Sequence, residues 1–346
     1  MKEALRLDDL LLSAKSIPII DVRSPKEYEH AHIPGAVNIP LLNNEHRAII
    51  GTTYKESGRE KAVIKGFELV GPEFSRFINE ALVISPQKKV LVYCWRGGMR
   101  SNIMAWVLKT AGFETHTLIG GYKTYRRWAM EVFKKEKNIR ILGGLTGSGK
   151  TDILKGLEMR GELVIDLEGI ANHKGSAFGS LGLGAQPSTE QFENNLALAW
   201  DGIDSEKVLW LEDESSNIGK VKIPDVVFGM MKRAKVIKVS ISEEIRLRKL
   251  VEDYSKFPKD VLKECTLKIS KRLGHLRLAQ SLEFLEAGDM ESWVKMMLEY
   301  YDKAYLYCLS QRLAATIVEM NFDTDDMEII CKKLMDLKNF SNRIHS

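Results

Sequence analysis

The sequence predicts an α/β protein in which two domains with parallel sheets are followed by a helical segment. Two short apolar runs, at 90–93 and 139–142, each end in a turn that holds a cysteine or glycines. Such a run is typical of a buried parallel strand that leads into a helix. Further apolar runs alternate with helical patterns and lie at 17–22, 163–166, 208–211 and 236–239. This alternation of strands and helices indicates α/β architecture in both domains.

The length of 346 residues exceeds what one hydrophobic core usually serves, so more than one domain is expected. We expect a first domain over 1–137 and a second over 138–242. Residues 122–137 should form a basic linker helix at the end of the first domain. From about residue 243 the pattern becomes helical, so a helical segment over 243–346 should pack on the second domain.

The opening residues include acids where a signal peptide needs its apolar region, and no run approaches the roughly 18 apolar residues of a membrane span. We therefore expect a cytoplasmic protein that does not enter a membrane. Its four cysteines, at 94, 265, 308 and 331, are far apart and form no C-x-x-C pair. A zinc site or disulfide framework is not expected, so a reactive cysteine would act alone.

Charge is spread unevenly along the chain. The net charge is only +4, which does not by itself imply a nucleic-acid partner. Residues 232–277, however, contain 14 lysines and arginines against 6 acidic residues. On charge alone, a solvated helical face and an RNA-binding surface both remain open for this segment.

The first candidate site begins with residues 21–28, D-V-R-S-P-K-E-Y, and 31–40, A-H-I-P-G-A-V-N-I-P. Together the two segments resemble the opening signature of rhodanese domains, which implies a rhodanese-like α/β domain. For Asp21 and His32, a structural role in shaping the fold is favoured over a catalytic one.

The rhodanese resemblance also implies a cysteine in a strand-to-helix loop, and residues 94–101, C-W-R-G-G-M-R-S, supply it. Loop amides and the following helix N-terminus should face the sulfur, while Arg96 and Arg100 add positive charge. Each of these effects lowers the pKa of a thiol. Cys94 is therefore the candidate nucleophile, and Arg96 and Arg100 are its expected catalytic partners.

Five residues separate Cys94 from Arg100, whereas the common sulfurtransferase form of this loop has four. The C-x5-R spacing also resembles the phosphate cradle of cysteine phosphatases, so a phosphatase stays open. The wider loop equally suits a cysteine that accepts selenium from selenophosphate, whose phosphate would lie among the same backbone amides.

Residues 144–151, G-L-T-G-S-G-K-T, fit the pattern G-x-x-x-x-G-K-[ST] and lie between a predicted strand and a predicted helix. They predict a P-loop NTPase-like parallel-sheet domain. Lys150 would neutralise a bound diphosphate, and Thr151 would reach a Mg²⁺ ion. The residues expected to hold the diphosphate are Gly144, Gly147, Ser148, Gly149, Lys150 and Thr151.

Two polar segments follow strands of the second domain, 166–179, D-L-E-G-I-A-N-H-K-G-S-A-F-G, and 212–219, E-D-E-S-S-N-I-G. Open α/β sheets bind ligands at the carboxyl ends of their strands. Asp213 or Glu212 could serve as the acidic metal partner, and we assign Asp213 together with Thr151. Helix capping is the alternative role for both acids.

The order of these motifs closely resembles one family, the tRNA 2-selenouridine synthases, and the resemblance extends to 299–302, E-Y-Y-D. It implies a substrate tRNA that carries 2-thiouridine at the wobble position of the anticodon. Geranyl diphosphate would first alkylate the sulfur, and selenium from selenophosphate would then replace the geranylthio group. Cys94 would carry that selenium as an S-selanyl adduct.

The implied chemistry needs a cradle for departing pyrophosphate, which a P-loop offers. No tightly bound cofactor is implied beyond Mg²⁺ with the diphosphate. The residues expected at the domain interface or the nucleobase are His173, Lys174, Ser176, Glu212, Asp213 and Ser215. Those expected to contact tRNA phosphates are Arg126, Arg127, Arg246, Arg248, Lys249, Lys271 and Arg272.

Two other functions remain open at this point. One is a rhodanese-type sulfurtransferase or cysteine phosphatase with a nucleotide-regulated P-loop domain, which would need no tRNA. The other is a non-enzymatic module in which the P-loop senses a nucleotide and the helical end binds a partner.

Overall fold

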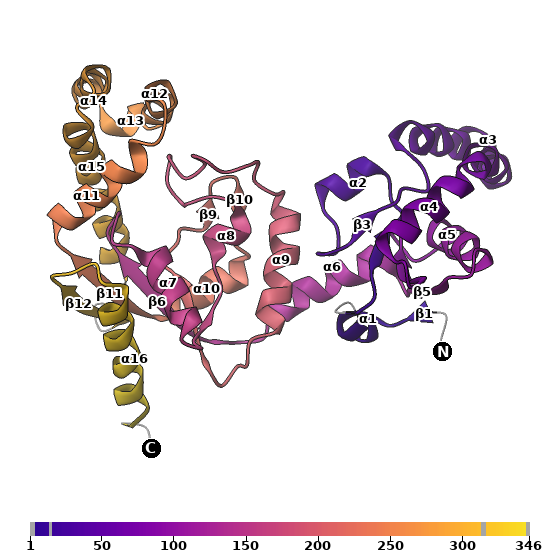
Figure 1. The fold of residues 1–346 in the computed structure, drawn as a ribbon, viewed down its shortest axis with the longest axis horizontal. Helices are drawn as coiled ribbons and strands as arrows, with labels where there is room; N and C mark the ends of the chain where they lie inside the picture. Colours follow the sequence, from indigo (N-terminus) through magenta and orange to yellow (C-terminus); the bar gives the residue numbers. More distant parts are fainter. Residues whose placement is uncertain (1–3, 14–15, 313–315, 344–346) are drawn as a thin grey trace. The chain divides into compact units, whose positions relative to one another are not determined.

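The structure is a computed structural model that describes residues 4–13, 16–312 and 316–343. The chain forms two compact units (Figure 1). The first contains residues 1–132 and 190–198, and the second contains 133–189 and 199–346. The first unit thus ends before the expected boundary at 137, and the expected helical segment belongs to the second unit. Among the described residues, no helix is long and apolar enough to cross a membrane.

The first unit is built on a five-stranded parallel sheet in the order β1-β5-β4-β2-β3. Its strands are β1 (Ala4–Leu5), β2 (Ile19–Asp21), β3 (Val37–Asn38), β4 (Lys89–Tyr93) and β5 (Glu114–Leu118). Its helices are α1 (Leu7–Ser13), α2 (Pro25–His30), α3 (Asn44–Val70), α4 (Phe74–Ile84), α5 (Met99–Thr110) and α6 (Gly121–Val132), with a 3-10 turn over Gly71–Glu73. The strands predicted at 17–22 and 90–93 are confirmed as β2 and β4.

Strand β4 is apolar because both of its faces are covered. Val90 and Val92 pack in one hydrophobic core with Phe77 of α4 and Met104 of α5. The strand pairs in parallel with β2, with Asp21 opposite Tyr93. The chain segments that follow β2 and β4 therefore leave the sheet at the same edge.

The second unit has its own five-stranded parallel sheet, in the order β12-β11-β6-β8-β7. Its strands are β6 (Asn138–Gly144), β7 (Leu163–Val164), β8 (Val208–Glu212), β11 (Lys235–Ile241) and β12 (Ile317–Phe322), beside a two-stranded ribbon of β9 (Asn217–Ile218) and β10 (Val221–Lys222). Its first helices are α7 (Lys150–Met159), α8 (Leu167–Ala171) and α10 (Asp225–Arg233), while α9 (Thr189–Asp201) runs through both units. The predicted strands at 139–142, 163–166, 208–211 and 236–239 are confirmed as β6, β7, β8 and β11.

The chain beyond residue 243 is mostly helical. Its helices are α11 (Glu243–Tyr254), α12 (Lys259–Lys268), α13 (Ser270–Leu273), α14 (His275–Ala287), α15 (Met290–Ser310) and α16 (Met327–Arg343). Phe178, Leu262 and Trp293 belong to one core that joins these helices to the loop after α8. The segment therefore packs on the unit that contains the P-loop.

The expectation of a purely helical segment is corrected by β12, which pairs in parallel with β11 along its whole length and extends the sheet (Figure 1). β12 is a half-exposed edge strand between two long helices, so its short pattern is hard to separate from helical periodicity. Helix α16 then packs on α7, with Cys331 and Ile153 in the same core. Asp326 precedes α16 and its carboxylate accepts from the Glu328 amide over 2.8 Å, as a helix cap does.

Candidate functional site

Cys94 directly follows β4 and lies in the loop that leads to α5. The residue is 4% exposed. The Gly98 amide donates to Cys94 Sγ over 3.3 Å, and Ser101 Oγ lies 3.4 Å from the same sulfur. Burial opposes ionisation of the thiol, but these hydrogen bonds, together with the amides of Ser101 and Arg96, lower the pKa of Cys94. The loop therefore favours the thiolate, the form that reacts as a nucleophile.

Arg96 and Arg100, whose guanidinium groups were expected to activate Cys94, have different surroundings. Arg100 pairs with Glu27 of α2, with Nη1 2.7 Å from Oε2. Arg96 is exposed, and it is the backbone amide of this residue that favours the thiolate. Ser101 and backbone amides lower the thiol pKa, and the electrostatic role expected of Arg96 and Arg100 stays a prediction. Burial acts to raise the pKa of Glu27, but the pair with Arg100 lowers it overall.

Two glycines let the Cys94 loop lie against the start of α6. Gly97 has φ of +64° and Gly121 has φ of +60°. A Cβ atom on Gly121 would lie 2.2 Å from the Cys94 carbonyl oxygen. The Tyr122 amide donates to the same carbonyl over 2.9 Å. Only glycine fits so close a backbone contact at this φ, and the contact fixes the strand end that carries the thiol.

Asp21 holds a buried network at the end of β2. Its carboxylate accepts from Arg23, with Nη2 2.6 Å from Oδ2, and from the Tyr93 hydroxyl over 2.7 Å. His32 stacks on Tyr28, with ring centroids 3.9 Å apart. These contacts agree with the structural role predicted for Asp21 and His32. Arg23, which was not singled out from its motif, neutralises the Asp21 carboxylate inside the domain.

The second site is the loop between β6 and α7. Lys150 Nζ donates to the Gly144 carbonyl over 3.1 Å. Gly147 and Gly149 have φ of +80° and +75°, which curls the backbone. Ser148 is buried, and its Oγ has no hydrogen-bond partner among the described residues. A hydroxyl left without a partner inside such a loop fits an acceptor such as a phosphate oxygen.

Helices α11 and α15 support this loop from one side. Arg246 is 3% exposed, donates to the Thr146 carbonyl over 3.1 Å and pairs with Asp302 over 2.9 Å. The Gly144 amide donates to the Tyr305 hydroxyl over 3.0 Å. Arg246 was expected at tRNA phosphates, and this expectation is corrected because its guanidinium is buried on partners inside the protein. The role of Tyr305 was not predicted.

A group of three carboxylates faces the start of α7. Oxygen atoms of Glu168, Glu212 and Glu214 lie within 4.8 Å of one another. Thr151 Oγ1 lies 3.3 Å from Glu168 Oε2 and 3.5 Å from Glu212 Oε2. Carboxylate and hydroxyl oxygens suit Mg²⁺, so these residues fit the cation that was expected to accompany a diphosphate. Glu168 and Glu214 were missed because a linear sequence does not show that their carboxylates lie close to that of Glu212.

Asp213, the assigned metal partner, is directed elsewhere. Its Oδ1 accepts from Arg312 over 2.7 Å, and its Oδ2 accepts from the Tyr305 hydroxyl over 3.1 Å. Glu212 instead lies 3.5 Å from Lys150 Nζ. Neighbouring residues at a strand end point to opposite sides of the sheet, so two adjacent acids have different partners. The assignment of Asp213 is therefore corrected in favour of Glu212.

Burial and mutual repulsion keep these carboxyl groups from ionising easily. Burial, followed by the charge of Glu212, raises the pKa of Glu168 to about 7. Burial raises the pKa of Glu212, and burial with the charges of Glu168 and Glu212 raises the pKa of Glu214 well above its ordinary value. A divalent cation would relieve this repulsion, which is a second reason why the cluster fits one.

The residues predicted at the nucleobase or interface have varied surroundings. His173 is 8% exposed, and burial with the nearby Lys268 lowers its pKa. Its Nδ1 has no hydrogen-bond partner within the described part of the chain. Lys174 and Ser215 are exposed, while Ser176 and Ser215 make local hydrogen bonds with the backbone. Their contact with a nucleobase stays a prediction.

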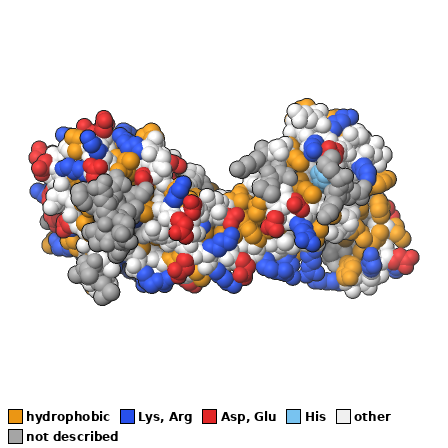
Figure 2. Space-filling model, turned by 90° about the horizontal axis from the view of Figure 1, so that it is seen from below, with side chains coloured by type: hydrophobic (Ala, Val, Ile, Leu, Met, Phe, Trp, Pro, Cys, Tyr) orange, Lys and Arg blue, Asp and Glu red, His pale blue; other side chains and the backbone are white. Residues whose placement is uncertain are grey.

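Most cations predicted to contact tRNA have acidic partners. Arg126 Nη2 lies 2.6 Å from Glu193 of α9. Arg248 pairs with Asp325, and Lys249 pairs with Asp152. On the face that Figure 2 shows, Lys and Arg side chains at the left lie among Asp and Glu side chains. The remaining members of the predicted set, all exposed, are Arg127, Lys271 and Arg272.

Comparison with known proteins matches both units to described families. The model of the tRNA 2-selenouridine synthase AAA domain matches residues 137–332. The rhodanese-like domain model matches residues 4–127. The two matches cover the P-loop and the Cys94 loop respectively.

Curated relatives resemble the chain over most of its length. The tRNA 2-selenouridine synthase of Bdellovibrio bacteriovorus is 34% identical over 87% of this chain and 91% of its own. The enzyme of that name from Shewanella oneidensis is 32% identical over 88% of this chain and 89% of its own. The one from Nitrosomonas europaea is 37% identical over 72% of this chain and 66% of its own. With these relatives and a family model that spans more than half of its residues, the chain belongs to the tRNA 2-selenouridine synthase family.

Proposed function

We propose that this protein replaces the sulfur of 2-thiouridine at the tRNA wobble position with selenium, in two steps that use its two sites. The main support for the proposal is that one chain of this family contains both an activated thiol and a loop suited to a diphosphate. Cys94 Sγ lies 3.3 Å from the Gly98 amide nitrogen, and Lys150 lies in the glycine loop beside the acidic cluster. Each site supplies what one of the steps requires.

In the first step, the base sulfur attacks C1 of geranyl diphosphate, a sulfur–carbon bond forms, and pyrophosphate leaves. Charge develops on the departing diphosphate, so donors that surround it accelerate the step. Lys150, the loop amides and the unpartnered Ser148 hydroxyl would supply these donors. Mg²⁺ bound by Thr151, Glu168 and Glu212 would neutralise further charge.

In the second step, the alkylated sulfur leaves C2 of the base as geranylthiol, and selenium takes its place. A thiocarbonyl sulfur is a poor leaving group, and alkylation removes that obstacle. The Cys94 thiolate would attack C2 and expel geranylthiol, the selenium of selenophosphate would then displace Cys94 from C2, and water would cleave the selenium–phosphorus bond and release phosphate. A lowered pKa increases the fraction of Cys94 that is present as the thiolate, the form that reacts as a nucleophile.

The test is mass analysis of nucleosides from thiolated tRNA after reaction with geranyl diphosphate, with and without selenophosphate. We expect Cys94→Ala to accumulate the S-geranyl nucleoside and form no 2-selenouridine. Lys150→Ala should form neither product from thiolated tRNA. Cys308→Ala is the matched control, because Cys308 is an exposed cysteine in α15, and it should behave as wild type.

Other outcomes would contradict the proposal. Equal loss of both steps in Cys94→Ala would contradict the assignment of one step to each site. If the wild-type protein incorporated no selenium but transferred sulfur or hydrolysed a phosphate ester, the sulfurtransferase or phosphatase alternative would replace it.

A further inference from the structure

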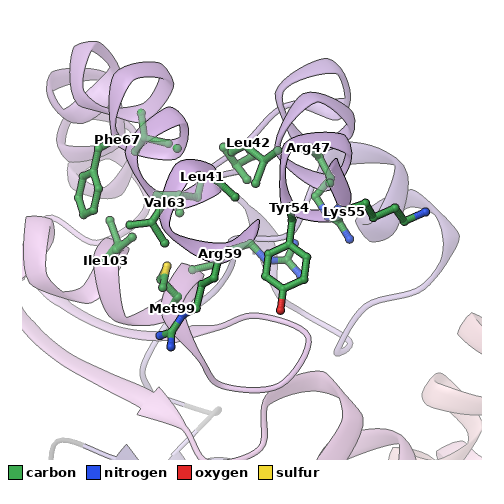
Figure 3. A pocket seen from close by; sticks show the side chains of 16 residues that line it. Leu41, Leu42, Arg47, Tyr54, Lys55, Arg59, Val63, Phe67, Met99 and Ile103 are labelled. Carbon is green, nitrogen blue, oxygen red and sulfur yellow. The ribbon is translucent and has the colours of Figure 1, made fainter. Parts of the chain in front are cut away.

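The first unit contains an apolar cavity of about 490 Å³ beside the Cys94 loop (Figure 3). Helix α3 forms much of its wall, because Gly58, with φ of +83°, breaks the helix into two arms. Tyr54 comes from the first arm, Val63 from the second, and Ile103 from α5. A cavity of this size matches those that hold small ligands in other proteins.

The wall of this cavity leaves large apolar side chains in contact with solvent. Tyr54 is 58% exposed, Phe67 is 49% exposed and Met99 is 46% exposed. Figure 3 shows all three directed toward the hollow between the arms of α3 and the start of α5. Several exposed apolar groups around one concavity favour an apolar occupant, which would remove them from water.

The charged residues of the cavity are all positive. Arg47, Lys55, Arg59 and Arg100 line it, and the described lining includes no carboxylate. A purely hydrocarbon ligand would gain nothing from these positive charges. The combination instead suits a hydrocarbon chain carried by a polyanion, such as a nucleic acid or a diphosphate.

The wall of the cavity and the reactive thiol belong to the same hydrophobic core. The wall residues Leu41 and Val70 share this core with Cys94. Met99 and Arg100 begin the helix whose N-terminus follows the Cys94 loop. The wall and the thiol are therefore parts of one packed structure within the first unit.

A second, polar hollow adjoins the cavity. Trp95 of the Cys94 loop lines it together with Glu27 and Lys26, and Arg47 lines both hollows. The Arg100–Glu27 ion pair joins a residue of one hollow to a residue of the other. A half-exposed tryptophan beside a lysine suits a nucleobase and its phosphate.

We propose that the apolar cavity binds the ten-carbon prenyl chain of the S-geranylated wobble nucleoside while its base lies beside Cys94. The inference rests on the proposed function. Geranyl diphosphate carries the same chain, but its proposed diphosphate site belongs to the other unit, whereas the cavity wall includes Met99 and Arg100, which begin the helix after Cys94. By holding the chain, the cavity selects the alkylated base over the unalkylated one and retains geranylthiol as the C2–sulfur bond breaks and the C2–selenium bond forms.

The test compares two anticodon stem-loop RNAs, one with S-geranyl-2-thiouridine and one with 2-thiouridine, in direct binding measurements. The wild-type protein should bind the geranylated RNA about tenfold or more tightly. Val63→Trp fills the cavity and should abolish this preference. Ile64→Trp is the matched control, because Ile64 is the adjacent residue of α3, is 55% exposed and does not line the cavity.

A second variant, Phe67→Asp at the rim of the cavity, controls for misfolding. Phe67→Asp changes a side chain that is already 49% exposed, so the melting temperature should stay at the wild-type value while the preference for geranylated RNA is lost. With selenophosphate, both cavity variants should convert pre-geranylated RNA about tenfold or more slowly, in proportion to the weaker binding. Geranylation of thiolated RNA by geranyl diphosphate should continue.

Two results would overturn the inference. One is a preference for geranylated RNA that survives in Val63→Trp and Phe67→Asp. The other is loss of geranylation with normal conversion of pre-geranylated RNA, which would assign the cavity to geranyl diphosphate. Failure of the proposed function looks different, because the wild-type protein would then make neither modified nucleoside.

Discussion

The guanidinium of Arg100 lies 2.7 Å from the carboxylate of Glu27, which joins the first turn of α5 to α2. The arginine that the C-x5-R spacing would place around a bound phosphate is therefore held by an acid. Hydrogen bonds from Ser101 and from backbone amides lower the pKa of Cys94. Within one motif, Arg100 therefore pairs with Glu27, while Ser101 contacts the Cys94 sulfur.

Ser101→Ala should make the Cys94 thiol less reactive. Removing the hydroxyl 3.4 Å from the sulfur takes away a hydrogen bond that lowers the pKa of Cys94. A hydrogen bond to a charged group contributes about 1.5–3 kcal/mol, so alkylation by iodoacetamide at neutral pH should slow by about tenfold. Arg100→Ala should leave that rate near the wild-type value. A larger effect of Arg100→Ala than of Ser101→Ala would show that guanidinium charge controls the thiol.

The acidic cluster should make stability depend on pH and on Mg²⁺. Burial and the charge of Glu212 raise the pKa of Glu168 to about 7. The folded protein then binds more protons than the unfolded chain between the ordinary glutamate pKa and about 7, so stability falls as pH rises through that window. Mg²⁺ binds the ionised carboxylates, so it should raise the melting temperature more at pH 8 than at pH 6.

Glu168→Gln tests the source of this dependence. The neutral side chain removes one repelling charge, so the metal-free variant should be more stable than wild type at pH 8, by up to about 3 kcal/mol. It should also lose most of the stabilisation by Mg²⁺. Glu158→Gln, at an exposed position of α7, should change neither property. A metal effect of equal size in both variants would exclude the cluster as the site.

Arg246→Ala should destabilise the second unit without changing how tRNA binding depends on salt. Arg246 is buried against Asp302 and the Thr146 carbonyl, and loss of one partner of a buried pair costs about 3–5 kcal/mol. Denaturant unfolding measures this loss. A lower salt slope for tRNA binding in a folded Arg246→Gln protein, which lacks the positive charge, would show that Arg246 contacts tRNA phosphates.

The sequence predicted features whose residues are continuous in the chain, and it missed contacts between residues that lie far apart in it. The Cys94 loop and the 144–151 loop are continuous in the chain, so local patterns predicted the strands that carry them. Thr151 meets Glu168 and Glu212 only after the sheet has formed, and Tyr305 reaches Gly144 from a helix far along the chain. Such contacts depend on packing, which no local pattern encodes.

The apolar cavity shows the same limit. Its wall combines Leu41, the two arms of α3 and the start of α5, and no continuous motif marks these segments as neighbours. Gly58 breaks α3, but Gly51 and Gly66 lie in the same helix, so the sequence alone does not single out the position of the break. The charge excess of 232–277 likewise did not show which cations have acids beside them, as Arg248 does.

Arg127→Ala should weaken tRNA binding through charge alone. Arg127 is exposed on α6, next to an arginine that pairs with Glu193. Each phosphate contact adds about 0.7–0.9 to the slope of the logarithm of affinity against the logarithm of salt concentration, so one lost contact should lower the slope by that amount. Arg76→Ala is the matched control, because Arg76 already pairs with Glu73 and Glu80 and should leave the slope unchanged. If the two variants have the same slope as wild type, tRNA binds to another surface, and Lys271 and Arg272 become the next cations to test.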